Sequence, residues 1–128
     1  MALRIAITID VPDLDAGLRF YGAAFGFEEV ARPAPMYAML QSGEARIALM
    51  EKPEGSLPAK GSDDRRRYGR HWTPVHLDLH VDDFEAALAR AVDAGATMEE
   101  RFDMEGRPPV AFCSDPFGHG FCLIGPRP

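Results

Sequence analysis

The sequence lacks the basic excess of a nucleic-acid-binding protein. The chain of 128 residues has 20 acidic and 14 basic residues and a formal net charge of −6 at pH 7. Nucleic-acid binders usually present a strongly basic face, so we expect no nucleic-acid partner. The main basic cluster, Arg65–Arg67 with Arg70, lies in a loop-like segment beside two aspartates, which favours a solvated run over a phosphate-binding site.

Cysteines are few, and long apolar segments are absent. Cys113 and Cys122 are too few for a disulfide framework, so we expect two buried thiols in a reducing compartment. A cross-strand disulfide between them stays open, because both are about equally far from the turn at 117–118.

No apolar run approaches the roughly 20 residues of a membrane span, and residues 1–5 lack the apolar core of a signal peptide. We therefore expect a cytoplasmic protein with no membrane partner.

Two common catalytic signatures are missing as well. No nucleophile stands with its base in a recognisable pattern, and no glycine-rich phosphate loop is present. The hydrophobic fraction of 46% is ordinary for a globular chain of this size, which is long enough to bury a core. We expect a single domain over residues 1–128.

The most informative stretch runs from Thr73 to Asp83, where apolar and polar residues alternate strictly. Side chains of a strand point alternately to its two faces. The expected apolar, core-facing row is Val75, Leu77, Leu79 and Val81, and the polar row is His76, Asp78 and His80. Two imidazoles and a carboxylate side by side suit a ligand or a metal ion. An ordinary solvated face is the alternative.

The two halves of the chain repeat one pattern. A strand over 3–11 precedes a helix that Asp13 caps and Gly26 ends, and a hairpin of 36–40 and 45–50 follows. One constant offset along the chain relates Val11 to Val81, Asp13 to Asp83, Leu14 to Phe84, Ala16 to Ala86, Leu18 to Leu88 and Ala24 to Ala94.

The second half is expected to contain the corresponding elements. Asp82, with Glu85 three residues later, is the expected helix cap, and Gly95 is the expected end of that helix. Strands over 110–114 and 120–124 form its hairpin. The pattern predicts an α+β fold with module one at 3–50, a linker loop at 51–71 and module two at 72–125. Each module leaves one sheet face uncovered, so two modules together are expected to form a ligand-binding cup.

Several motifs together resemble the vicinal oxygen chelate superfamily, which includes glyoxalase I, the bleomycin resistance proteins and the extradiol dioxygenases. The motifs are Val11–Leu14, Phe20–Tyr21, Phe25–Phe27, Val81–Asp83 and Asp115–Gly118. The resemblance implies two βαβββ modules, a curved mixed sheet with a concave cup, and a homodimer.

The resemblance also implies four metal-ligand positions, which here are Ala6, Ala48, His76 and Cys122. Only His76 matches the usual histidine, since alanine cannot ligate a metal and Cys122 stands where a carboxylate is usual. A set of His76, His80 and Cys122 needs a bulged strand, because four residues of strand separate the two histidines by roughly 13 Å. We therefore expect no metal and no cofactor; one divalent ion at His76 and Cys122 is the alternative.

The bleomycin-resistance branch is similar to this chain in lacking the metal set. The resemblance thus implies metal-independent sequestration of an aromatic or drug-like small molecule, as in antibiotic resistance. The expected ligand-binding residues are His76, Asp78, His80, Arg46, Trp72, Tyr37 and Cys122. The alternative is a metal-dependent lyase, isomerase or dioxygenase with a rearranged metal site, so the sequence leaves open whether a reaction is catalysed.

Overall fold

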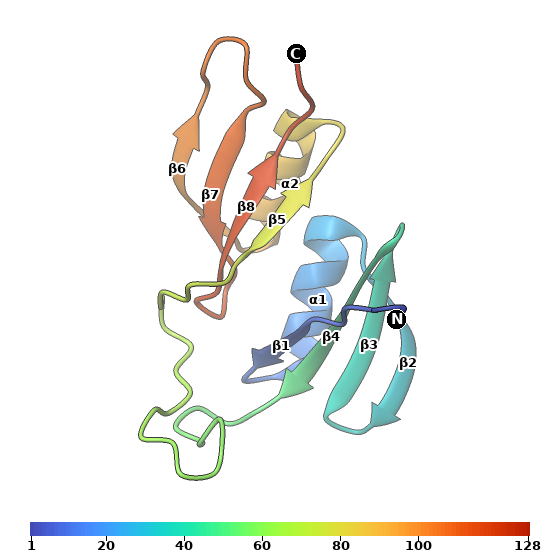
Figure 1. Ribbon diagram of the computed structural model, residues 1–128, viewed down its shortest axis with the longest axis vertical. Coiled ribbons are helices and arrows are strands. Elements are labelled where there is room, and N and C mark those ends of the chain that lie inside the picture. The colour runs from blue at the N-terminus through green and yellow to red at the C-terminus, as the bar shows by residue number, and fades with distance from the viewer. The chain divides into compact units, whose positions relative to one another are not determined.

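The computed structural model describes residues 1–128 and contains two modules with the same order of elements (Figure 1). The first comprises β1 (Thr8–Val11), α1 (Leu14–Phe25), β2 (Glu28–Ala34), β3 (Tyr37–Ser42) and β4 (Ala45–Glu51). The second comprises β5 (Leu77–His80), α2 (Phe84–Ala94), β6 (Thr97–Phe102), β7 (Val110–Ser114) and β8 (Gly120–Ile124).

Contacts within the chain divide it into two compact units. The first unit is Met1–Gly22 with Gly26–Arg67, and the second unit is Ala23–Phe25 with Tyr68–Pro128. Neither helix is long and apolar enough to cross a membrane.

The two sheets share one topology. Their strand orders are β1-β4-β3-β2 and β5-β8-β7-β6, and each has four strands. In each sheet the first strand pairs parallel with the last, and the remaining pairs are antiparallel. The predicted repeat and the α+β class with two βαβββ modules are confirmed.

Aspartate caps start both helices. Asp13 accepts a hydrogen bond from the backbone N–H of Ala16, and Asp83 accepts one from Ala86. The predicted cap at Asp82 is wrong. Helix α2 begins at Phe84, and the carboxylate that accepts from the N–H of Ala86, three residues later, belongs to Asp83. Gly26 ends α1 with φ of 72°, a left-handed conformation that glycine adopts at little cost.

The core of the first unit lies between α1 and the sheet. Val11, Leu40 and Leu49 are almost completely buried there. A Cβ atom on Gly17 would lie 3.0 Å from the Leu49 side chain and 3.2 Å from Val11. Close packing of helix on sheet thus explains a glycine in mid-helix, which costs about 1 kcal/mol relative to alanine in an exposed position.

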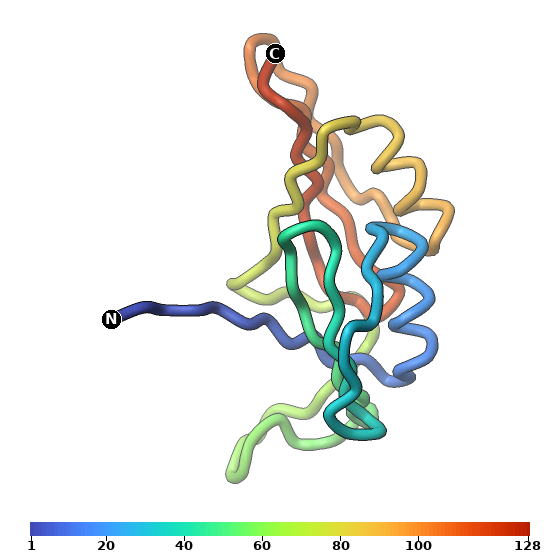
Figure 2. Tube along the Cα trace, turned by 90° about the vertical axis from the view of Figure 1, so that its right-hand side faces the viewer, coloured from blue at the N-terminus to red at the C-terminus, as the bar shows by residue number.

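The first strand of each module is shorter than predicted. β1 begins at Thr8, not Leu3, and in Figure 2 the dark blue N-terminal trace extends outward from its sheet. Thr8 pairs with Ala48, so the same register would set Leu3 opposite Gly43 in the β3–β4 turn. Leu3 therefore has no strand partner, although β4 itself extends to Ala45, which this register sets opposite Ile5.

Strand β5 in the second unit is also shorter than predicted. It begins at Leu77, which pairs with Phe121, so Val75 would face His119 in the β7–β8 turn. The prediction that Val75 is a core residue is wrong, since this side chain is exposed. The other three members of the apolar row, Leu77, Leu79 and Val81, are half-buried.

Two arginines of the basic cluster are fixed in place and do not form a solvated run. The Arg66 side chain is only 15% exposed, and its Nε lies 2.7 Å from Asp10 Oδ2. Arg66 also donates hydrogen bonds to the Ser56 hydroxyl and the Leu57 carbonyl oxygen. The irregular segment between β4 and β5 is therefore fastened to the first unit at Arg66.

Candidate functional site

A cavity of about 250 Å³ lies in the second unit. One side is formed by strand residues that include Phe112 on β7 and Gly120 and Cys122 on β8. The other side comes from the irregular segment before β5 and includes Trp72 and His76. The cavity therefore has a strand floor and a loop wall, and both apolar and polar side chains reach it.

Most of the loop wall belongs to a segment, Tyr68–Thr73, that we call the strap; His76 follows it in the chain. Its His71 N–H donates to the Gly118 carbonyl oxygen at 3.2 Å. The His71 and His119 rings meet with Nε2 and Nδ1 2.9 Å apart, and their planes are nearly perpendicular. Polar contacts thus hold the strap against the turn that joins β7 to β8.

That turn explains part of the motif at Asp115–Gly118. The buried Asp115 carboxylate accepts hydrogen bonds from the backbone N–H groups of Phe117 and His119. Gly118 has φ of +83°, and a Cβ there would lie 2.1 Å from the Gly69 carbonyl oxygen. The motif therefore folds a turn whose glycine leaves room for the strap backbone.

Arg70 anchors the strap to β6 at the edge of the cavity. Its guanidinium makes a two-point ion pair with Glu99, with N–O distances of 2.5 and 2.9 Å. The hydrogen bond from Arg70 lowers the pKa of the Glu99 carboxyl, with its charge as a weaker cause. Arg70 also donates to the carbonyl oxygens of His71 and Gly118. A Cβ on Gly120 would lie 2.9 Å from the guanidinium, so this glycine makes room for it.

His76, Asp78 and Cys122 converge beside the cavity. Asp78 pairs with Cys122 across the parallel β5–β8 ladder, which sets both side chains on one face. His76 Nε2 lies 3.1 Å from Asp78 Oδ1, and one donor atom from each of the three residues lies within 4.8 Å of the others. Cys122 is 8% exposed.

The Cys122 sulfur is a thiol at neutral pH. Burial raises the pKa of this thiol to about 11, with the Asp78 charge and hydrogen bond as further causes. A protonated thiol is a poor nucleophile, so the cluster does not resemble an activated cysteine site.

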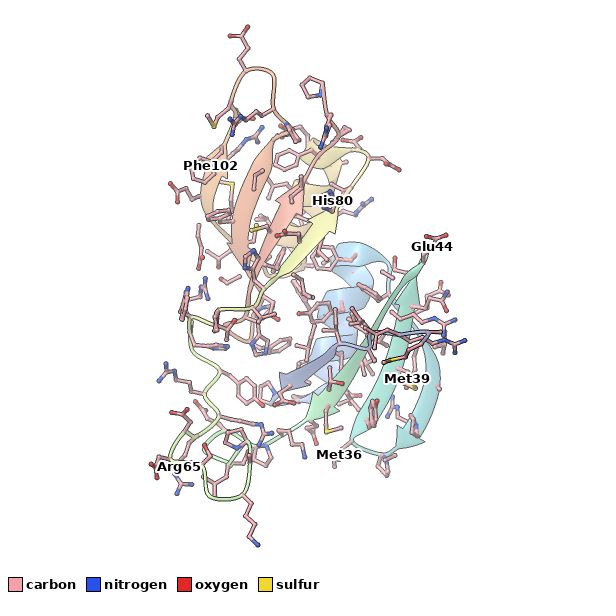
Figure 3. All side chains as sticks on the ribbon, in the orientation of Figure 1. Met36, Met39, Glu44, Arg65, His80 and Phe102 are labelled. Carbon is pink, nitrogen blue, oxygen red and sulfur yellow. The ribbon has the colours of Figure 1, made fainter.

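The four positions at which the resemblance implies metal ligands do not make that site. Ala6 precedes β1 and Ala48 lies in β4, and neither methyl group can donate to a metal. His80, the second histidine considered from the sequence, lies exposed at the end of β5 (Figure 3). It is not a member of the cluster. Among the residues that can ligate a metal, Asp78 takes the place expected of His80.

The other residues predicted to bind a ligand are divided between the two units. Trp72 borders the cavity. Tyr37 pairs with Met50, and the exposed Arg46 pairs with Gln41, both between strands β3 and β4 of the first unit. Arg46 alternates with the buried Ile47 and therefore points away from the core, as its spacing predicts.

Sequence reasoning missed most of the residues that line the cavity, among them Arg70, Glu99 and Phe112. Arg70 was expected to be solvated, and β6, which carries its partner Glu99, was not located. The two glycines in Gly118-His119-Gly120 were the available signal, since both leave space for the strap.

Cys113 and Cys122 do not form the disulfide that the sequence left open, and both are free and buried. Cys113 pairs with Phe121 and Cys122 with Phe112, so the two cysteines are offset by one position. Successive strand residues point to opposite faces, which separates the thiols. The expectation of two buried thiols is met by the structure.

Comparison with known proteins gives a family and a fold. A glyoxalase-like domain model matches residues 6–124. FosX, a fosfomycin resistance protein from Listeria monocytogenes, is structurally similar with a TM-score of 0.74 and 19% identity, covering 98% of this chain and 94% of that one. Lactoylglutathione lyase from Agrobacterium tumefaciens has a TM-score of 0.66 and 19% identity, with the same two coverages.

A glyoxalase/bleomycin resistance protein from Albidiferax ferrireducens T118 is also similar, with a TM-score of 0.67, 19% identity, and 96% and 97% of the two chains covered. No curated protein matches the sequence. At such identities the solved structures show a shared fold, and the domain model, which spans nearly the whole chain, shows the family. The chain belongs to the glyoxalase-like domain family, within the vicinal oxygen chelate superfamily.

Proposed function

We propose that the protein binds and sequesters a small aromatic molecule in the cavity of the second unit, without a metal ion. The observation that carries this proposal is Trp72, which is 79% exposed and borders a cavity that also contains Phe112. An indole held at the mouth of a cavity offers a flat apolar face to a ligand ring. Arg70, Glu99 and His76 supply polar groups that can orient it.

The size of the cavity limits the ligand. Sites for drug-sized molecules have volumes of about 300–1,000 Å³, and this cavity is slightly smaller. Arg70 is already paired with Glu99, so the cavity offers no unpaired guanidinium for a strongly acidic ligand. A molecule with one or two rings and little net charge fits these conditions.

The alternative function is that of a metal-dependent lyase, isomerase or dioxygenase. One FosX structure from Listeria monocytogenes was solved with Mn(II) and a dihydroxypropylphosphonic acid. The alanines at positions 6 and 48 favour sequestration over the family's metal chemistry, because a chelated substrate needs several fixed ligands around the ion.

Replacing His76 by alanine should weaken ligand binding and leave the fold intact. His76 is half exposed and borders the cavity, so its loss removes a polar contact and little packing. One lost hydrogen bond costs about 1 kcal/mol, or roughly fivefold in affinity. The measurement is a fluorescence titration of Trp72, the single tryptophan, with benzamide, phenol and quinoline in buffer containing a chelator.

The matched control is His80→Ala, because His80 lies on the same strand but outside the cavity lining. It should keep the affinity of the unaltered protein. Equal affinities for all three proteins, or loss of the thermal transition in His76→Ala, would show that His76 is not a ligand contact.

We propose further that the protein is a homodimer. Each sheet has one helix to cover one face, and the apolar Leu3 and Ile5 are exposed before β1. Association would cover such apolar surface. Sedimentation equilibrium at micromolar concentration should give about twice the 14.1 kDa chain mass. A mass near that of one chain would contradict the dimer.

A further inference from the structure

We propose that His76, Asp78 and Cys122 form a binding site for one zinc-like divalent cation, contained entirely within the second unit. One donor atom from each residue lies within 4.8 Å of the others. This site differs from the arrangement that the family resemblance implies, because its third donor is Asp78 and because Ala6 and Ala48 contribute nothing. It also does not depend on the proposed sequestration of an aromatic molecule, which requires no metal.

Strand pairing brings the three donors together. Asp78 and Cys122 are direct partners on the neighbouring strands β5 and β8. His76 precedes Asp78 by two residues and reaches its carboxylate at 3.1 Å. The backbone register therefore sets two of the three positions, and His76, directly before β5, supplies the third donor.

The distances suit a small tetrahedral ion. Zinc binds histidine nitrogen and aspartate oxygen at about 2.0–2.2 Å and cysteine sulfur at about 2.3 Å, which places two donors on one ion roughly 3.3–3.6 Å apart. The His76–Asp78 separation of 3.1 Å is already close to that value, and the widest separation, at most 4.8 Å, must shorten by about 1 Å.

The donor types select the kind of cation. Sulfur is a soft ligand that magnesium and calcium avoid, whereas sulfur, imidazole and carboxylate together are typical of zinc. His76 and Cys122 both line the cavity, so a fourth coordination position would face it. Three protein ligands with one open position form the arrangement of zinc sites that bind or activate a small molecule.

The test uses Co(II) as a spectroscopic substitute for zinc, added to full-length protein that has been stripped of metal with a chelator. We expect one equivalent of cobalt to produce a cobalt–sulfur charge-transfer absorption, and one equivalent of Zn(II) to remove it. Cys122→Ser should abolish this absorption, and Cys113→Ser should retain it because Cys113 is not a member of the cluster.

The remaining variants test the other two donors. His76→Ala and Asp78→Asn should weaken cobalt binding at least tenfold, whereas His80→Ala should stay within twofold of the unaltered protein. Circular dichroism is used to check that each variant is folded. If Cys122→Ser does not fold, Cys122→Ala is used in its place. Absence of the charge-transfer band, its persistence in the Cys122 variant, or equal losses in His76→Ala and His80→Ala would overturn the cation site.

The two proposals can fail separately. Aromatic binding in chelator without a cobalt–sulfur band would overturn only the cation site. A cobalt–sulfur band that requires Cys122, without any aromatic binding, would overturn only the proposed sequestration.

Discussion

Replacing Gly118 by alanine should destabilise the second unit more than any other single methyl group added to a turn of this chain. Gly118 has φ of +83°, and a Cβ there would lie 2.1 Å from the Gly69 oxygen and 2.6 Å from the Gly69 carbonyl carbon. The left-handed conformation costs an alanine about 1–2 kcal/mol, and overpacking adds about 1–3 kcal/mol. Thermal melting should therefore show a loss of about 2–5 kcal/mol.

Gly106→Ala is the matched control for this substitution. Gly106 also belongs to the second unit and has φ of +75°, but a Cβ there would meet no atom within 4 Å. The control should lose only the conformational cost of about 1–2 kcal/mol. Equal melting temperatures for the two alanine variants would show that the strap does not press on Gly118.

The repeat and the helix ends could be predicted because local signals encode them. Asp13, Gly26 and Gly95 act at helix ends within one turn of the chain, and the predicted strands 110–114 and 120–124 have the observed bounds. Strands β2 and β6 could not be located. All seven residues of β2 are exposed and one of them is Pro33, so this edge strand has no buried apolar row to produce alternation.

The candidate site could be predicted only in part. Alternation predicts that His76 and Asp78 share a face, and their side chains are in contact. The pairing of Asp78 with Cys122 depends on the parallel register of two strands far apart in the sequence. Arg70 was misjudged for a related reason, because its role depends on Glu99 in a strand that had no recognisable pattern.

Replacing Arg70 by methionine should release the strap and weaken ligand binding together. The substitution keeps most of the side-chain length but removes the ion pair with Glu99 and two hydrogen bonds to carbonyl oxygens. An exposed ion pair contributes about 0–1 kcal/mol, and a hydrogen bond from a charged donor about 1.5–3 kcal/mol. We expect thermal melting to show a net loss of about 2 kcal/mol in the free energy of unfolding. With an aromatic probe present, the emission of Trp72 should be red-shifted relative to that of the unaltered protein.

The same substitution should change how stability depends on pH. Arg70 holds the pKa of Glu99 below its ordinary value of 4.5, so the ionised carboxylate stabilises the folded state above that pH. This contribution is lost as pH falls through the lowered pKa. The melting temperature of Arg70→Met should therefore fall less steeply toward acid pH, giving a flatter acid limb than that of the unaltered protein. Glu99→Gln should show the same flattening, whereas Arg90→Met, at an exposed arginine of α2, should not. An acid limb in Arg70→Met as steep as that of Arg90→Met would mean that the Arg70–Glu99 pair does not hold the strap in solution.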